Sequence, residues 1–448
     1  MTDSSSTSST SSTGSTGGTG SDRDVVVVAG ARTPFVKAGT TLAGLSAVQL
    51  GRFAVREAIE RADIDPRELD EVVVGNIAGP PDAANLARVI ALMAKVPAHV
   101  PAFTVNRNCA SGLESIVEAA YRIRSGHADL MVAAAVESMS QIPLLFDTEA
   151  QQIWTRLARS RGLMASARVA ASFRPRHFKP VIALVLGLTD PVSGLNMGET
   201  AEVLAREFQI DREAQDAFAL QSHQRAAAAW AEGRMQDEVI PVPVPPAYRA
   251  AADHDNGIRE KQSMEALAKL RPVFDRKTGS VTAGNSSQIT DGAAALVLAS
   301  GARARELNLP VLGRLRSWSF AGCDPARMGL GPVFATPLAL RRAGVTLDQM
   351  ELIEINEAFA AQVLACFKAF GSRDFAESQL GSAPPGEPDP ARVNVNGGAI
   401  ALGHPVGATG GRLVLTMLNE MARRDASLGL VTLCIGGGQG AAMVLERS

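Results

Sequence analysis

Short apolar runs alternate with segments of helical periodicity along the first 140 residues of the chain. Apolar runs at 25–28, 72–74 and 128–138 are typical of buried strands. Apolar positions recur every three or four residues over 46–62 and 83–94, which predicts helices there. Strands that alternate with helices in this way predict an α/β fold, with a mostly parallel sheet covered by helices on both faces.

This rhythm is lost between residues 141 and 270, where we expect an inserted domain. Between Glu149 and Asp190 the chain carries no acidic residue. Apolar residues alternate there with basic ones, namely Arg156, Arg159, Arg161, Arg168, Arg174, Arg176, His177 and Lys179. Such a segment suits an anionic membrane surface or an acidic partner. It equally suits a solvated face that covers a cleft, or a site for the phosphates of a ligand.

The α/β pattern returns near residue 271, and an internal repeat relates the two ends of the chain. Residues 58–74 and 339–355 each contain the end of a helix, a short turn and a strand. A looser match relates 130–133 to 430–433. Because the repeats occur in the same order, we expect two similar βαβ halves.

The repeat and the break in rhythm together suggest domain boundaries. We expect an N-terminal half built from 24–140 and 271–312, an inserted domain at 141–270, and a C-terminal half at 313–448. Within the last half, the Pro-rich stretch 371–391 predicts an exposed loop.

Composition narrows the classes of function. The 448 residues have a net charge of −2, which predicts no general attraction to nucleic acid. Four cysteines without a CxxC pair do not make a disulfide scaffold or a zinc site, and they fit a reducing cytosol. Residues 1–23 are rich in Ser, Thr and Gly, so we expect a disordered tail and no secretory signal. The sequence contains no run of ~18 apolar residues, so we expect no membrane span.

Cys109 is the first candidate for chemistry. It follows an apolar lead-in that ends at Val105, and it precedes a segment of helical periodicity at 113–123. The N-terminus of a helix offers free backbone N–H groups and a positive dipole end, which favour a thiolate. The alternative interpretation is a buried structural cysteine.

Three further motifs follow in the second half of the chain, each at a strand end or a helix start. They are Asn356-Glu357-Ala358-Phe359, Gly403-His404-Pro405 in a Gly-rich turn, and Cys434-Ile435-Gly436-Gly437-Gly438. Open α/β folds gather ligand groups at such places. His404 titrates near neutrality and could act as a base for Cys109.

These groups together suit reversible acyl transfer coupled to cleavage of a carbon–carbon bond. Cys434 could move a second proton, Asn356 could hold a water or polarise a carbonyl, and the glycines after Cys434 let backbone N–H groups approach an oxyanion. Cys323 and Cys366 lack such surroundings, so we interpret them as packing residues.

From residue 24 to its C-terminus, the chain resembles the thiolase family. The matching motifs are NRNCASGLESI, NEAFAAQ, GHPVGATGGR and CIGGGQGAAM. The resemblance implies two duplicated βαβαβ halves, packed as a layered α/β/α/β/α core, with an inserted loop domain that covers the coenzyme A site. It implies an acyltransferase that cleaves 3-ketoacyl-CoA with coenzyme A, or condenses acetyl-CoA in the reverse direction. Coenzyme A and acyl-CoA would be substrates, with no permanently bound cofactor and no metal.

The resemblance also implies roles for individual residues. Cys109 would be acylated, His404 would activate it, and Cys434 would be the acid/base for the acetyl group. Asn356 and His404 would frame one oxyanion hole, the former through a water. The backbone N–H groups of Cys109 and Gly436 would form the other. Residues near coenzyme A would be Met197, Ser287, Ala358 and Phe359.

Within the family, GLNMGETAE, SHQRAAAAW and LGPVFATPLAL are most similar to the thiolase subunit of trifunctional fatty-acid complexes. That subgroup implies a hydratase/dehydrogenase partner subunit and contact with the inner surface of a membrane. Asn356 stands where the subgroup usually carries His, and CIGGGQG is more similar to the common soluble thiolases. The family implies a cytoplasmic homodimer or homotetramer that acts on small acyl-CoA substrates.

Two other interpretations compete with a thiolase. A decarboxylating condensing enzyme shares this fold, but it needs Cys with two His or with His and Asn, and Cys434 argues against it. A non-catalytic protein that binds acyl-CoA or a membrane surface would not need all four motif residues.

Overall fold

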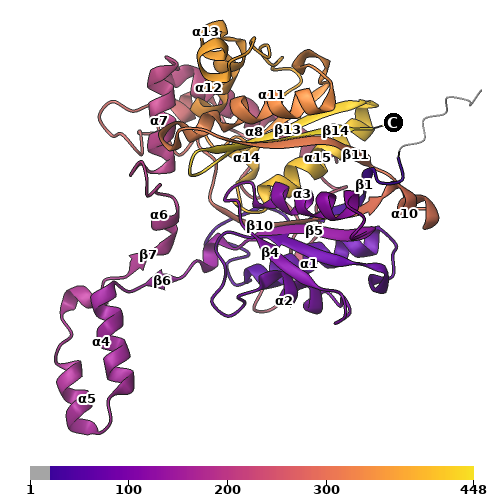
Figure 1. The fold of residues 1–448 in the computed structure, drawn as a ribbon. Coiled ribbons are helices and arrows are strands. Elements are labelled where there is room, and N and C mark those ends of the chain that lie inside the picture. The colour runs from indigo at the N-terminus through magenta and orange to yellow at the C-terminus, as the bar shows by residue number, and fades with distance from the viewer. Residues whose placement is uncertain (1–20, 448) are drawn as a thin grey trace, which may run out of the picture.

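The computed structural model describes residues 21–447, and most of the tail expected at 1–23 lies outside them. The body is layered (Figure 1): helices, a sheet, a central layer of helices, a second sheet and further helices. This is the layered α/β/α/β/α core that the resemblance implied. An arm made of helices α4 and α5 projects from this body.

The first half of the chain builds the lower layers in Figure 1. Its strands are β1 (Val25–Arg32), β2 (Val36–Lys37), β3 (Glu71–Gly75), β4 (Ala102–Val105), β5 (Leu130–Glu137) and β10 (Thr290–Ser300). Its helices are α1 (Ala47–Arg61), α2 (Leu86–Met93), α3 (Ser111–Arg124) and α10 (Gly301–Glu306). The helices and strands expected over 46–62, 72–74, 83–94 and 128–138 are therefore confirmed, with ends that shift by up to three residues.

The second half builds the upper layers. Its strands are β11 (Gly313–Gly322), β12 (Leu352–Ile355), β13 (Leu428–Ile435) and β14 (Gln439–Glu446). Its helices are α11 (Gly331–Ala343), α12 (Ala360–Gly371), α13 (Arg373–Phe375), α14 (Ala399–Leu402) and α15 (Thr409–Arg424).

Between β5 and β10 the chain forms mostly helices. They are α4 (Thr148–Arg159), α5 (Leu163–Ala170), α6 (Ala183–Gly187), α7 (Met197–Glu207), α8 (Arg212–Ala231) and α9 (Met264–Ala268). Two small strand pairs accompany them, β6 (Leu144–Leu145) with β7 (Val181–Ile182), and β8 (Val242–Pro243) with β9 (Ala251–Ala252). Helices α7 and α8 pack against α12 of the second half, whereas α4 and α5 project away from the body (Figure 1).

The internal repeat is confirmed in three dimensions. The end of α1, a 3₁₀ turn and β3 correspond to the end of α11, a 3₁₀ turn and β12. Strand β5 lies parallel to β3, and β13 lies parallel to β12. The repeated pair of strands is therefore parallel in both halves of the chain.

The expectation of a mostly parallel sheet is wrong. The strand order is β12-β13-β14-β11-β1-β10-β5-β3-β4, and parallel pairing is confined to β12/β13, β3/β4 and β3/β5. Strands β1, β5 and β10 are buried along their whole length, so no alternation of polar and apolar residues records their direction. The halves of the sheet meet only where Val26 and Val27 of β1 pair with Arg314 and Gly313 of β11.

The central layer consists of α3 and α15, which lie between the two halves of the sheet (Figure 1). One apolar cluster contains residues of both helices and of strands from both halves. The helices touch backbone to backbone near their N-termini. A Cβ on Gly112 of α3 would lie 2.7 Å from the N atom of Gly411, and one on Gly410 would lie 2.4 Å from the N atom of Leu113. Only glycine permits this approach.

The Pro-rich stretch 371–391 is not an exposed loop throughout. It begins with α13 and a π-helical turn at Ala376–Leu380. Phe375 is buried against Phe208 and Phe334, with ring centroids at 6.2 and 6.0 Å. Only the later residues, from about 381, form the exposed loop that the prolines predicted.

Candidate active site

Cys109 lies in the loop between β4 and α3, two residues before the helix begins. The loop is a tight turn, because the N–H of Arg107 donates to Ser111 Oγ at 2.9 Å and Ser111 Oγ donates to the carbonyl of Asn108 at 2.7 Å. Asn108 takes a left-handed conformation with φ 45°, which Asn tolerates better than most residues. The turn holds Cys109 beside the apolar central layer, where it is partly buried.

The surroundings of Cys109 oppose ionisation. Burial raises the pKa of its thiol, and the nearby Glu137 carboxylate raises it further. The backbone N–H groups of Gly436 and of Cys109 itself lie near the sulfur and lower the pKa in part. The helix start alone therefore does not decide the state of Cys109, because desolvation opposes the thiolate that a helix start favours. A thiol in this site needs a base to become a nucleophile.

His404 is a buried, neutral imidazole. Burial lowers its pKa to about 3, and the charge of Arg412 contributes in the same direction. Its Nδ1 lies 2.6 Å from Thr409 Oγ1, and this hydroxyl also donates to the carbonyl of Pro405 at 3.3 Å. We assign the tautomer in which Thr409 donates to Pro405 and the imidazole Nδ1–H donates to Thr409. In this tautomer Nε2 carries the lone pair that can accept a proton.

Asn356 faces that lone pair. It follows directly after β12, where its N–H donates to the carbonyl of Thr432 at 3.0 Å. Its Nδ2 lies 3.4 Å from His404 Nε2, while its buried Oδ1 has no hydrogen-bond partner within the described part of the chain. Buried polar atoms are normally satisfied by protein or ordered water. The Asn356 amide and the His404 imidazole thus form a polar pair with capacity for one further partner.

Cys434 reaches the same region of the molecule from the second half of the chain. It is buried near the C-terminal end of β13. Burial raises the pKa of its thiol, and the neighbouring Cys109 raises it further. The turn after it is joined to the Cys109 loop, because Asn108 Nδ2 donates to the carbonyl of Gly436 at 2.8 Å. Two cysteines from different halves of the chain thus lie within electrostatic reach of each other.

An apolar wall adjoins Cys434. One cluster contains Cys434, Ala358 and Phe359, and Met197 packs against it from the start of α7. The N–H of Ser287 donates to the carbonyl of Ala358 at 2.9 Å. Three of the four residues that the resemblance placed near coenzyme A therefore belong to the apolar cluster of Cys434 or pack against it, and the fourth, Ser287, is bonded to one of them.

Direct contacts among the reactive groups are few. Within residues 21–447, no hydrogen bond joins the Cys109 sulfur to His404 or to Cys434. Of the remaining cysteines, Cys366 is fully buried and its thiol donates to the carbonyl of Gly329 at 3.2 Å, which agrees with a packing role. Cys323 lies closer to the site than expected, because its N–H donates to the carbonyl of Gly438 at 2.7 Å.

Sequence reasoning missed two groups that shape the site. Thr409 orients His404, and only its position in the same Gly-rich turn could have suggested this. Glu137, at the end of β5, accepts N–H bonds from Ile77, Ala78 and Gly407 at 3.2, 3.0 and 3.2 Å. Burial raises its pKa to about 7. A carboxylate at the end of an apolar strand was the available signal.

The assembled site can carry out two proton transfers around one nucleophile. It offers a thiol with two N–H groups near its sulfur, a neutral base with an amide beside it, and a second thiol at the apolar wall. Within the described residues, no group of three or more His, Cys, Asp or Glu side chains is arranged to hold a metal ion. In the same part of the chain, no helix has the length and apolar character required to cross a bilayer.

Comparison with known proteins gives matches over almost the whole chain. The family described as "Thiolase, N-terminal domain" matches residues 25–302, and "Thiolase, C-terminal domain" matches 309–447. A 3-ketoacyl-CoA thiolase of Yersinia pestis (strain Pestoides F) is 44% identical over 424 residues, which cover 94% of this chain and 96% of that relative.

Solved structures agree with this. An acetyl-CoA acetyltransferase of Bacillus anthracis superposes with a TM-score of 0.82 at 36% identity, covering 94% of this chain and 98% of that one. A human mitochondrial 3-ketoacyl-CoA thiolase in complex with CoA superposes equally well, with a TM-score of 0.82 at 36% identity and coverage of 95% and 98%.

Proposed function

Because the chain belongs to the thiolase family of acyltransferases, we propose that it cleaves 3-ketoacyl-CoA with coenzyme A. The products are acetyl-CoA and an acyl-CoA shortened by two carbons, as in the β-oxidation of fatty acids. Coenzyme A is a substrate in this reaction, and no permanently bound cofactor is required.

In the first half-reaction, His404 Nε2 takes the proton of the Cys109 thiol and the sulfur attacks the 3-keto carbon. The resulting oxyanion is held by the backbone N–H groups of Cys109 and Gly436. The bond between C2 and C3 then breaks, and its electron pair moves into the enolate of acetyl-CoA. That enolate oxygen accepts from the protonated His404 and from a water on Asn356. Cys434 gives its proton to C2, and acetyl-CoA leaves.

In the second half-reaction, the thiol of coenzyme A attacks the acyl-Cys109 thioester after losing its proton to the Cys434 thiolate. The tetrahedral oxyanion returns to the same two N–H groups. Its collapse expels Cys109 sulfur, which recovers its proton from His404. Each group thereby returns to its starting protonation state.

The observation that carries the proposal is the convergence on Cys109 of groups from both halves of the chain. The N–H of Gly436 lies near its sulfur, Asn108 Nδ2 donates to the carbonyl of Gly436 at 2.8 Å, and Cys109 is near enough to Cys434 to raise the pKa of that thiol. A raised thiol pKa beside a neutral imidazole favours a nucleophile that is activated only with substrate present. The apolar wall of Met197, Ala358 and Phe359 supports binding of the acyl-CoA next to Cys434.

The direct test is the mass of the intact protein after mixing with acetoacetyl-CoA without free coenzyme A. We expect one acetyl adduct in the wild type and none in Cys109→Ala, whereas Cys366→Ala, a buried cysteine outside the site, should behave as wild type. An unmodified wild type, or an adduct that persists in Cys109→Ala, would exclude the assignment.

A second candidate is synthesis or cleavage of acetoacetyl-CoA as the main activity. It is supported by the likeness to the Bacillus anthracis acetyl-CoA acetyltransferase, and it uses the same groups in the same roles. Turnover measured on 3-ketoacyl-CoA esters of increasing chain length separates the two: a preference for chains longer than C4 supports the thiolytic enzyme, and activity confined to C4 supports the acetyltransferase. If none of the CoA esters is turned over, the remaining interpretation is a non-catalytic protein that binds acyl-CoA.

We also propose that the enzyme is a cytoplasmic homodimer or homotetramer of the trifunctional-complex type, which attaches to an anionic membrane surface through its arm. The support is the pair Leu163 and Met164 at the start of α5, with 87% and 88% exposed surface. Exposed Arg159 and Arg161 directly precede them. Apolar side chains among arginines suit the boundary between lipid headgroups and acyl chains. Size-exclusion chromatography with light scattering, with and without a hydratase/dehydrogenase subunit, tests the assembly.

A further inference from the structure

A charged pair lies in the middle of the apolar central layer, behind the polar pair of Asn356 and His404. Arg412 of α15 is fully buried, and its Nη1 donates to Glu354 Oε2 of β12 at 2.8 Å. The guanidinium cannot lose its proton in a protein, so the Glu354 carboxylate is its counter-charge. Burial raises the pKa of Glu354 above its ordinary range, and the Arg412 guanidinium opposes that rise.

Such a pair is a poor choice for stability alone. Removing two charges from water is costly, and apolar residues of similar volume at such positions are often neutral or stabilising. Glu354 occupies a strand whose other residues, Leu352, Ile353 and Ile355, are all apolar and buried in the layers on its two sides. Nε and Nη2 of Arg412 also lack a partner within residues 21–447. The charges therefore need an explanation beyond packing.

The position of the pair supplies one. Glu354 stands two residues before Asn356, and Arg412 stands three residues after Thr409, which orients His404 at 2.6 Å. One bond at 2.8 Å thus connects α15, whose Thr409 is bonded to the imidazole, to β12, which ends just before Asn356. The gap between His404 Nε2 and Asn356 Nδ2, 3.4 Å, depends on how that helix sits against that strand.

We propose that the Arg412–Glu354 pair is a positioning device for the oxyanion site. It fixes α15 against β12 so that the His404 imidazole and the Asn356 amide keep the spacing that holds one water. Burial disfavours a protonated His404 imidazole, and the guanidinium charge of Arg412 adds to that effect. The inference rests on the proposed thiolase function for its first readout only.

The charged groups around Arg412 come from several elements. Glu354 lies in β12 and Glu357 lies two residues after its end, and Arg225 of α8 lies within electrostatic reach of both. Glu238 also acts on Glu354, but it is committed to Arg32, at 2.7 Å, on the N-terminal half of the sheet. Of these groups, Arg412 is the one that acts on His404.

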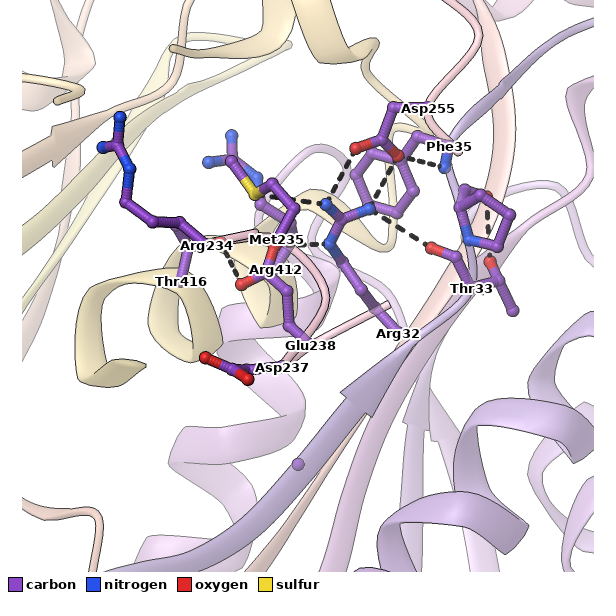
Figure 2. Close-up of polar contacts among 12 residues, drawn as sticks. Arg32, Thr33, Phe35, Arg234, Met235, Asp237, Glu238, Asp255, Arg412 and Thr416 are labelled. Atoms are coloured by element: carbon purple, nitrogen blue, oxygen red, sulfur yellow. Dashed lines mark hydrogen bonds and ion pairs between the residues drawn. The ribbon is translucent and has the colours of Figure 1, made fainter. Parts of the chain in front are cut away.

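A second buried contact of the same helix provides a matched control. Thr416, one turn after Arg412, donates to Glu238 Oε2 at 2.9 Å (Figure 2). It therefore connects α15 to the Arg32 network and does not connect it to β12. Thr416→Val removes a buried polar tie of α15 while leaving the Arg412–Glu354 pair intact.

The experiment compares wild type with Glu354→Leu/Arg412→Met, Arg412→Lys and Thr416→Val, after thermal unfolding has shown that each is folded. In the double variant we expect kcat for thiolysis to fall by about tenfold to a hundredfold, because sub-ångström placement of catalytic groups matters that much. KM should change little, since the pair does not touch the Met197 wall. In its pH–rate profile, the rate should fall on the acidic side at a higher pH than in the wild type. That pH should still lie below the ordinary imidazole range, because burial remains.

Arg412→Lys keeps the charge but not the planar contact, so it should lose kcat and keep the wild-type acidic limb. Thr416→Val should keep both. A double variant with wild-type kcat and profile would overturn the proposal, and so would equal losses of kcat in Thr416→Val and the double variant without a new acidic limb.

A readout without substrate separates this inference from the proposed function. The ¹⁵N signals of the His404 ring, assigned with His404→Gln, should titrate at higher pH in the double variant than in wild type or Arg412→Lys. If the wild type has no thiolase activity but this shift is seen, the proposed function fails and the positioning of His404 stands. If the shift is absent, the charge of Arg412 does not govern His404 and the inference fails.

Discussion

Replacing Thr409 by Val removes the hydroxyl that is bonded to His404 Nδ1. The shape of the side chain at position 409 is preserved. Thr409 Oγ1 lies 2.6 Å from His404 Nδ1 and is fully buried. Without it, the imidazole proton is free to move to Nε2, and the lone pair that accepts the Cys109 proton is then lost. A hydrogen bond with a net value of about 0.5–1.5 kcal/mol biases the two tautomers by a factor of roughly 2 to 13.

We therefore expect Thr409→Val to be acylated at Cys109 by acetyl-CoA roughly twofold to tenfold more slowly than wild type, because the loss cannot exceed the tautomer bias. This loss is smaller than the ~10²–10⁴ expected when the base itself is removed in His404→Ala. Rapid-quench mixing followed by intact-mass measurement gives the rate directly. Thr409→Ser retains the hydroxyl and should remain near the wild-type rate, while Thr416→Val makes the same substitution at a buried threonine on the same helix.

An acylation rate in Thr409→Val equal to that of wild type would refute the reasoning, because the tautomer would then be set by something other than this bond. A loss as large as that of His404→Ala would also contradict it, since tautomer bias alone cannot supply such a factor. The pH–rate profile adds a further check. With the pKa of His404 lowered to about 3, its protonated form is absent near neutrality, so the wild-type rate should show no histidine limb between pH 5 and 8.

Three further outcomes are expected. Cys434→Ser should still be acetylated at Cys109 by acetyl-CoA but should condense ~10²–10⁴ times more slowly; turnover within a few-fold of wild type would contradict its acid/base role. Asn356→Ala should lose ~10²–10³ in turnover with a smaller change in coenzyme A affinity, and Asn356→His should retain activity with a new pH dependence near neutrality; an Asn356→Ala variant as fast as wild type would remove Asn356 from the oxyanion site. Leu163→Ser/Met164→Ser should weaken co-sedimentation with anionic vesicles but not thiolysis, and equally poor wild-type binding to anionic and neutral vesicles would exclude membrane attachment.

Much of the site could be predicted because its parts are local in sequence. A strand, a polar turn and a helix start surround Cys109, and the turns that carry His404 and Gly436 are rich in glycine. Such units are recognisable from periodicity and turn residues alone. The repeat of 58–74 at 339–355 likewise predicted two halves, because each copy folds into the same helix, turn and strand.

The remainder depends on contacts between distant residues. Glu354 and Arg412 are far apart along the chain, and they come together only when α15 packs against β12. The strand directions were mistaken because fully buried strands have the same composition whether parallel or antiparallel. The desolvation of Cys109 also depends on such contacts: a helix start is visible in sequence, but the burial that opposes ionisation arises only when both halves pack around the thiol.

The glycine contact between α3 and α15 has a consequence for engineering and for sequence drift. Since the two helices meet through backbone atoms at Gly112 and Gly410, the distance between their N-terminal loops is set by van der Waals radii and not by side chains that selection could exchange. A library aimed at new acyl chains can therefore vary Met197 and Phe274, which line the wall near Cys434, while the spacing of the catalytic loops stays constant. Substrate preference can thus change through the apolar wall, while the glycine contact preserves the spacing on which the chemistry depends.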